Sequence, residues 1–328
     1  MHRFWSALGR LLSPEDASTR LGRERWLTRL ALPVFGISML STVVYAPDAV
    51  VDALRGGNQA GAIPAMAGAV VGIMLLLALA YRSHVRARPD ASGDYQLVRE
   101  ELGPRLGVFT GAALLVDYFF TVAVSVSAAA AVLAHVVPWF GDWQVVIALV
   151  LIGLLALGAL RGSRTQVRLS VFGFFALLAV IVTLLAMGAL RAALIEIEPL
   201  QPGSATVITA LIAYAGAISS GAVMVTGMEH LAVSGPYHKA PRGVRAGRTV
   251  MIATLAAAGS FFAVAWLAWT YRVTGWVDGP VVLQVAERVA GDWLAWIVAG
   301  VAMVVLYAAS STTYKRFTTL TAALARDG

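Results

Sequence analysis

The stretch ALPVFGISMLSTVVYAPDAVVDAL (31–54) decides the fold, because it is apolar enough to cross a membrane yet is interrupted in its middle. About 20 mostly apolar residues are needed to span a bilayer as a helix. Proline, glycine and polar residues interrupt the apolar pattern here: Pro33, Gly36, Ser38, Ser41, Thr42, Tyr45, Pro47 and Asp48. We therefore predict a membrane helix with non-helical backbone near its middle.

A second stretch, TVITALIAYAGAISSGAVMVTGMEHLAV (206–233), is interrupted in the same way, by Gly216, Ser219, Ser220, Gly221, Thr226, Gly227, Glu229 and His230. Unwound backbone is tolerated in a membrane only where protein or a water-filled cavity covers it. The two stretches are the first and sixth apolar runs of the chain, so they hold corresponding places in two five-helix halves. Such a pair is typical of inverted-repeat transporters. For either stretch alone, a glycine-rich packing helix is the alternative.

The rest of the chain supplies six more apolar runs, and together they predict an all-α, multi-pass membrane protein with eight spans. Hydrophobic residues make up 59% of the chain and charged residues 13%, against roughly 25% charged residues in a soluble domain. The predicted spans are 31–54, 60–81, 106–137, 143–160, 169–194, 206–233, 249–272 and 293–313.

The basic residues predict the orientation of these spans. Only four of the 25 Lys and Arg residues fall in the loops of one side, at Arg55, Arg191, Arg272 and Arg288. Since cytoplasmic loops carry the excess of Lys and Arg, we expect the inner (plasma) membrane with both termini in the cytoplasm. Residues 1–30 are then a cytoplasmic amphipathic segment and 314–328 a cytoplasmic C-terminal segment. The net charge of +7 thus reflects membrane topology, and we expect no nucleic-acid partner.

Asp117, within the third span, is the best-placed candidate for a binding residue. A carboxylate at the centre of a span costs about 2.5–3.5 kcal/mol, so such a residue is functional by default. Tyr118 follows it, and Thr121 lies one helical turn on, so the trio offers oxygen atoms to a proton or a monovalent cation. The alternative is a buried aspartate bonded to a neighbouring helix or held protonated.

Glu229, in the sixth span, is the candidate for proton coupling. It lies one turn after Thr226, and a carboxyl group in a low dielectric can load and release a proton near neutral pH. Because Glu229 is near the inner end of its span, solvation of a helix end is the alternative. Asp48 is interpreted as a turn residue after Pro47.

Several kinds of chemistry are missing from the sequence. The chain has no cysteine, which excludes disulfides, thiolate metal sites and cysteine nucleophiles. Its lysines, Lys239 and Lys315, do not end a G-x-x-x-x-G-K phosphate loop, and no H-x-x-x-H pattern occurs. We therefore expect no enzyme, no cofactor beyond a coupling proton, and no metal site beyond a monovalent cation at Asp117 and Tyr118.

Four segments resemble the amino acid-polyamine-organocation superfamily of permeases, and in particular its branch of KimA-type potassium:proton symporters. They are LSTVVYAPDAV (40–50), YQLVREELGPRLGVFTGAALLVDYFFTVAVSVSAAAA (95–131), SGAVMVTGMEHLAVSGP (220–236) and TTLTAALARDG (318–328). The resemblance implies a LeuT-like inverted-repeat fold with discontinuous first and sixth helices. It also implies a substrate site between these helices and the third and eighth.

The positions that match the family's potassium or proton site are Tyr45, Asp117, Tyr118, Thr121, Thr226 and Glu229; the polar residues beside the breaks, Ser38, Ser41, Thr42, Ser220 and Gly221, complete the expected site. Three departures leave the solute open. One is Val233, in the sixth span, where the potassium branch usually has asparagine. Ser38 stands where the potassium importers have an aspartate, and loss of that carboxylate weakens the case for a dehydrated cation. Amino acid permeases usually have a glycine pair in the first span, where this chain has only Gly36.

We therefore expect proton-coupled uptake of a small solute, either an amino acid or a monovalent cation such as potassium. Residues 31–194 form the first five-helix repeat and 206–313 an incomplete second repeat. Relatives continue through at least ten spans, so we expect a fragment of a longer permease, or else helices supplied by a partner chain, for example in a homodimer. The alternative function is a membrane sensor or binding protein that does not transport.

Overall fold

We analysed a computed structural model of the chain, which describes residues 28–89, 93–160, 163–201, 203–273, 275 and 279–327. The predicted N-terminal amphipathic segment, apart from its last three residues, lies outside the described residues. Within the described residues every regular element is a helix, so the expected all-α class is confirmed.

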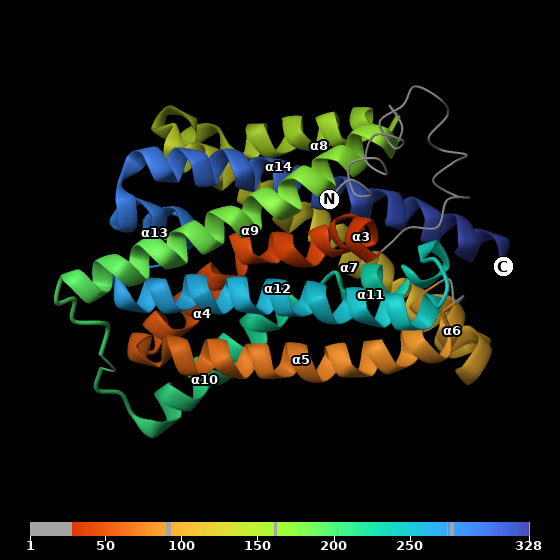
Figure 1. Ribbon diagram of the computed structural model, residues 1–328, viewed down its shortest axis with the longest axis horizontal. Coiled ribbons are helices and arrows are strands. Elements are labelled where there is room, and N and C mark those ends of the chain that lie inside the picture. Colours follow the sequence, from red (N-terminus) through yellow and green to blue (C-terminus); the bar gives the residue numbers. More distant parts are fainter. Residues whose placement is uncertain are drawn as a thin grey trace.

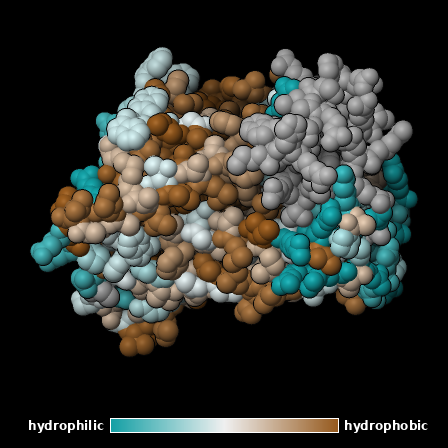
Figure 2. All heavy atoms as spheres, in the orientation of Figure 1, coloured by the Kyte–Doolittle hydropathy of each residue, from teal (hydrophilic) through white to brown (hydrophobic). Residues whose placement is uncertain are grey.

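Eight helical segments of the described chain are long and apolar enough to cross a membrane, as the sequence predicts. They are Ala31–Gly56, Ala60–Ala87, Pro104–Val136, Pro138–Gly158, Thr165–Leu194, Val207–Ala232, Arg242–Thr270 and Asp292–Arg326. Only 6% of the most apolar stretch of the fourth span is buried inside the protein, so this span lies at the periphery of the chain. Figure 2 shows hydrophobic residues over most of the visible face, with hydrophilic residues gathered toward its two ends.

The first and sixth spans are each built from two helices joined by a tighter turn. Span one consists of α3 (Thr28–Ser41), a 3₁₀ turn at Thr42–Val44 and α4 (Ala46–Gly56). Pro47 lies in the first turn of α4, where proline is tolerated because the N–H groups there have no partner within the helix. Span six consists of α10 (Val207–Gly221), a 3₁₀ turn at Ala222–Val225 and α11 (Met228–Ala232).

The other long helices are continuous, and two short ones lie between spans. The long ones are α5 (Ile63–Ala87), α7 (Pro104–Val136), α8 (Gln144–Leu160), α9 (Ser163–Leu194), α12 (Arg242–Thr270) and α14 (Asp292–Arg326). The short ones, α6 (Asp94–Leu102) and α13 (Val281–Ala290), fall in segments that the sequence analysis treats as loops. α14 runs on through residues 314–326, which we had assigned to a separate C-terminal segment.

The spans pack as two groups, which Figure 1 shows one above the other. Spans one, two, six and seven form the first group, here called the bundle, in which α12 packs on α5 and α3, and α10 packs on α4. Spans three, four, five and eight form the second, here called the scaffold, in which α14 packs on α7 and α9. Contacts of α3 with α9 and α14 join the two groups.

The two short helices mark opposite ends of the molecule (Figure 1). At the α13 end, Asp48 of the bundle accepts a hydrogen bond from the backbone N–H of Val281, with 2.7 Å between the atoms. A carboxylate at a helix N-terminus stabilises the free N–H groups there. His135 Nε2 lies 2.8 Å from Glu287 Oε1 and joins α7 to the same helix. α13 is therefore tied to both groups.

Candidate functional site

The two interrupted spans meet at their breaks. Gly227 has a φ of +96°, a backbone conformation that favours glycine. A Cβ atom built on Gly227 would lie 2.7 Å from the backbone nitrogen of Met39, so the two backbones are in direct contact. The hydroxyl of Thr42 lies 3.1 Å from the sulfur of Met224, within hydrogen-bond reach. The breaks thus occupy the same level of the molecule.

Hydroxyl groups satisfy part of the backbone beside the break in span one. Ser41 Oγ donates to the carbonyl oxygen of Ser38 at 2.6 Å, and Thr42 Oγ1 lies 2.7 Å from that of Met39. The Ser38 hydroxyl is buried and has no hydrogen-bond partner among the described residues. An unpaired buried hydroxyl is costly, so Ser38 keeps an unused capacity for hydrogen bonding.

A polar face of α7 is turned toward the interior. Tyr118, Thr121 and Ser125 are buried on this face, at intervals of three and four residues. Asp117 lies at its edge, half-buried, and makes no hydrogen bond or ion pair with another described residue. Tyr45 is close enough to Asp117 and Glu229 for their charges to act on it, and it lies beside Ser125.

Glu229 is held by the backbone at the break in span six. Its Oε2 accepts a hydrogen bond from the N–H of Gly227 at 2.9 Å, and its Oε1 lies 3.1 Å from Nδ1 of His230. The His230 ring in turn stacks on Tyr118, with 5.7 Å between ring centroids and 23° between planes. This chain of contacts connects Glu229 of the bundle with Tyr118 of the scaffold.

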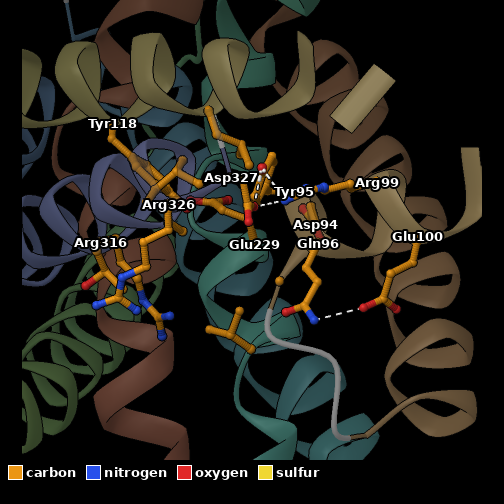
Figure 3. Close-up of a pocket in the computed structure, with 16 residues that line it drawn as sticks. Asp94, Tyr95, Gln96, Arg99, Glu100, Tyr118, Glu229, Arg316, Arg326 and Asp327 are labelled. Carbon is orange, nitrogen blue, oxygen red and sulfur yellow. Dashed lines mark hydrogen bonds and ion pairs between the residues drawn. The ribbon is translucent and has the colours of Figure 1, made fainter. Parts of the chain in front are cut away.

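A cavity of about 680 Å³ opens at the α6 end, between the two groups, and is called the α6 cavity below. Glu229 and Val233 border it from the bundle, and Tyr118 and Arg316 from the scaffold. Figure 3 shows Glu229 near Asp94 and Tyr95, with Arg316 to one side and Arg99 and Glu100 to the other. The cavity therefore combines a carboxylate of the bundle with guanidinium groups of α6 and of the scaffold helix α14.

Most charges in the α6 cavity have partners. The Tyr81 hydroxyl donates to Asp94 Oδ2 at 2.9 Å. Burial raises the pKa of Asp94 above its usual value, and this hydrogen bond offsets part of the rise. Asp327, at the end of α14, accepts a 2.7 Å hydrogen bond from Tyr95 and pairs with Arg99, both on α6. These contacts fasten the end of α14 to α6.

A second cavity, of about 540 Å³, lies nearer the α13 end and is called the α4 cavity. Tyr45, Asp48, Asp52 and Ser220 border it from the bundle, and residues 123–128 of α7 contribute its scaffold wall. The breaks of spans one and six therefore lie where two cavities approach from opposite ends.

A family model for amino acid permeases matches residues 27–328. The chain belongs to the amino acid permease family. It is also similar to the potassium transporter KimA of Bacillus subtilis (strain 168), with 28% identity over 334 residues that cover 98% of this chain and 54% of the relative. The chain thus spans about half the length of the curated relative that it matches. These findings confirm the resemblance seen in the sequence, and together with the eight apolar helices they indicate a multi-pass membrane protein.

The predicted site residues of this permease fall into three sets: those that border the α6 cavity, those that border the α4 cavity and those that border neither. Tyr118 and Glu229 border the α6 cavity, and Tyr45 and Ser220 border the α4 cavity. The others border neither cavity: Ser38, Ser41, Thr42, Asp117, Thr121, Gly221 and Thr226. A Cβ at Gly221 would collide with Val70 and lie 3.2 Å from Val50 Cγ2, so this glycine serves close packing of span six on α4 and α5.

Sequence reasoning missed Arg316, Asp94 and Tyr81. Arg316 was assigned to a cytoplasmic tail, although no proline or glycine separates it from the eighth span. That uninterrupted helical sequence was the available signal. Asp94 and Tyr81 are brought together by the packing of α6, which has no signal in the sequence. Among the described residues, no group of three or more His, Asp or Glu side chains is placed to hold a metal ion.

Proposed function

We propose that this permease is a proton-coupled secondary transporter that takes up a small solute into the cytoplasm by alternating access. The observation that carries the proposal is the meeting of the two interrupted spans between two cavities at opposite ends. Unwound backbone inside a membrane lines substrate and ion sites because freed carbonyls and helix ends can replace water around the solute.

The arrangement of the spans supports a LeuT-like inverted repeat. The broken helices are five spans apart, as two copies of a five-helix unit require. Each packing group also draws on both halves of the chain, since the bundle holds spans one and two with six and seven. Alternating access then follows from rocking of the bundle against the scaffold around the site at the breaks.

The charge distribution supports a plasma-membrane protein whose α6 end faces the cytoplasm. Arg82, Arg86 and Arg88 end α5 at the α6 end, whereas Arg272 and Arg288 lie near the α13 end with few other basic residues. Since Lys and Arg accumulate in cytoplasmic loops, the α6 cavity opens to the cytoplasm and the C-terminal end of α14 lies there.

The polar groups at the breaks suit a solute that needs oxygen ligands. We assign the solute to the space between Asp117 and Tyr118 of α7 and the two breaks, with the hydroxyls of Tyr45, Thr121 and Thr226 as further contacts. The unpaired hydroxyl of Ser38 is a contact as well. Glu229 carries the coupling proton, because it lies at the break in span six and borders the α6 cavity, into which it can release a proton.

Potassium is the first solute to test, since the relative of Bacillus subtilis is a potassium transporter. Potassium is bound by oxygen atoms, which this site supplies as carboxylate, phenol and hydroxyl groups. The missing first-span carboxylate at Ser38 favours weaker cation binding than in the potassium importers. Amino acids are the second class to test, because the family model describes amino acid permeases.

Uptake of radioactive rubidium and of a mixture of labelled amino acids into proteoliposomes tests the proposal. An inward proton gradient should drive accumulation of one of the two. Asp117→Asn should abolish it, with Asp142→Asn, on the turn before α8, as the matched control. A binding protein that does not transport would retain labelled solute without accumulation. Uptake that is unchanged in Asp117→Asn would exclude the assigned site.

A further inference from the structure

Arg316 is a basic side chain without an ionic partner in the wall of the α6 cavity. It comes from α14 of the scaffold, and its side chain is half-buried in that wall. It makes no ion pair or hydrogen bond with another described residue. Its guanidinium carbon lies 5.9 Å from the ring centre of Phe35, on the half-helix α3 of the bundle. The aromatic face supports the cation but does not neutralise it.

The carboxylates of the same cavity are already engaged. Asp94 accepts a bond from Tyr81, Asp327 pairs with Arg99, and Glu100 accepts a bond from Gln96. Glu229 also accepts from an uncharged donor, the backbone N–H of Gly227, and it is the carboxylate that the bundle contributes to the cavity wall. Glu229 and Arg316 are close enough for their charges to interact, and they belong to different packing groups.

Titratable groups from α6, α7 and α14 surround Glu229. Asp94 on α6 and Asp117 on α7 both act on Glu229 with like charge. Tyr118 faces it from α7, and the buried His230 adjoins it on α11. Arg316, on α14, supplies the opposite charge. An ionised carboxylate that must pass through the membrane interior needs such a compensating cation.

We propose that Arg316 is a positioning residue that pairs with ionised Glu229 in the empty transporter and neutralises it for the return step. The inference rests on the proposed function. When solute and proton have left through the α6 cavity, Glu229 keeps a negative charge. Arg316 then exchanges the ring of Phe35 for the carboxylate of Glu229. Phe35 and Glu229 both lie on the bundle. The guanidinium group of Arg316 therefore bridges the scaffold and the bundle whether it contacts the ring or the carboxylate.

Net uptake and solute exchange respond differently if this is right, because only net uptake requires the empty protein to return. In proteoliposomes, Arg316→Gln should lower net rubidium uptake by about tenfold or more, since an unpaired buried charge remains. Exchange of internal for external rubidium should keep the wild-type rate. Arg316→Lys should restore net uptake. Lys315→Gln removes a charge from the same turn outside the cavity, where Lys315 bonds to Gln166, and should change neither rate.

Equal loss of uptake and exchange in Arg316→Gln would overturn the inference, as would unchanged uptake. A wild-type protein that neither accumulates nor exchanges rubidium or amino acids would instead refute the proposed function. Thermal unfolding, which does not depend on transport, distinguishes failure of this inference from failure of the proposed function. Arg316→Gln should lower the unfolding temperature of solute-free protein in detergent, and should do so much less in a Glu229→Gln background. Additive effects of the two substitutions would show that the side chains are not coupled.

Discussion

Replacing Gly227 with alanine should break the contact at which the two interrupted spans meet. With a φ of +96°, an alanine at this position pays roughly 1–2 kcal/mol for the left-handed conformation. Its Cβ would also lie 2.7 Å from the nitrogen and 3.0 Å from the Cα of Met39. Backbone atoms cannot rotate away, and overpacking of this kind costs about 1–3 kcal/mol. We therefore expect Gly227→Ala to lower the free energy of unfolding by about 2–5 kcal/mol in total.

The assay is thermal unfolding of the detergent-solubilised protein, followed by tryptophan fluorescence. Gly259→Ala is the matched control, because Gly259 lies within α12 and a Cβ there would meet no atom within 4 Å. Alanine at an unobstructed helix position stabilises by about 0.5–1 kcal/mol. The two substitutions should therefore shift the unfolding temperature in opposite directions.

The reasoning is refuted if Gly227→Ala unfolds at the wild-type temperature or above it. That result would mean that the backbones of spans one and six are not in contact, and that the site cannot be assembled from the two breaks. A second readout comes from transport, since displacement of Met39 also displaces the hydroxyl groups next to it. Solute uptake should fall in Gly227→Ala and stay unchanged in Gly259→Ala.

Three further predictions concern stability. Asp48→Ala leaves the N–H of Val281 without its acceptor and should cost about 1–3 kcal/mol in thermal unfolding; an unchanged unfolding temperature would exclude the tie to α13. His238, outside the spans, has its pKa lowered to about 4 by burial and a neighbouring arginine. The folded state therefore binds fewer protons than the unfolded state. As the pH is lowered from 6.5 to 4, the free energy of unfolding should fall by at most about 1.4 kcal/mol per pH unit, and His238→Gln should remove this pH dependence. Asp327→Asn weakens a partly exposed pair with Arg99 and should change stability by less than about 1 kcal/mol, so a larger loss would mean that the end of α14 is held more firmly than its exposure implies.

The spans could be predicted because a membrane constrains sequence strongly. Each helix needs about 20 mostly apolar residues to cross the bilayer, so hydropathy alone places all eight. The interruptions were also visible, since Pro47 and Gly227 mark the points where regular helix is disfavoured. These signals do not show which residues of different spans are in contact, so nothing in the sequence places Gly227 against Met39.

The rotation of each helix was not predictable from a single sequence. Asp117 and Thr121 are one turn apart and were expected on a common face, but Thr121 is buried while Asp117 lies at the edge. Packing determines this angle. A Cβ at Gly111 would lie 2.8 Å from Leu324 of α14, so α7 turns its small residues toward that helix and its larger residues outward.

Arg316 was missed for a different reason. Hydropathy ends the eighth span where charge begins, whereas α14 continues as one helix to Arg326. A helix can carry a cation beyond its apolar segment and still place it in the interior, if a second element covers it. Here Phe35 of α3 provides part of that cover. The helix α6 lines another part of the same cavity, and its nine residues form too short and polar a segment to be identified as a packing element.

The two cavities connect the packing groups to the proposed transport cycle. Each cavity has one wall from the bundle and one from the scaffold, so any rotation of one group against the other changes both volumes. Because the breaks lie between the cavities, a rotation that widens one end narrows the other around a fixed point. Packed groups have discrete arrangements and do not deform continuously. We therefore expect two states of the protein, with the solute site at the pivot. The scaffold wall of the α4 cavity, as far as the described residues form it, has no charged groups, whereas the α6 cavity has several, so the energy difference between the two states would depend on whether the proton is bound.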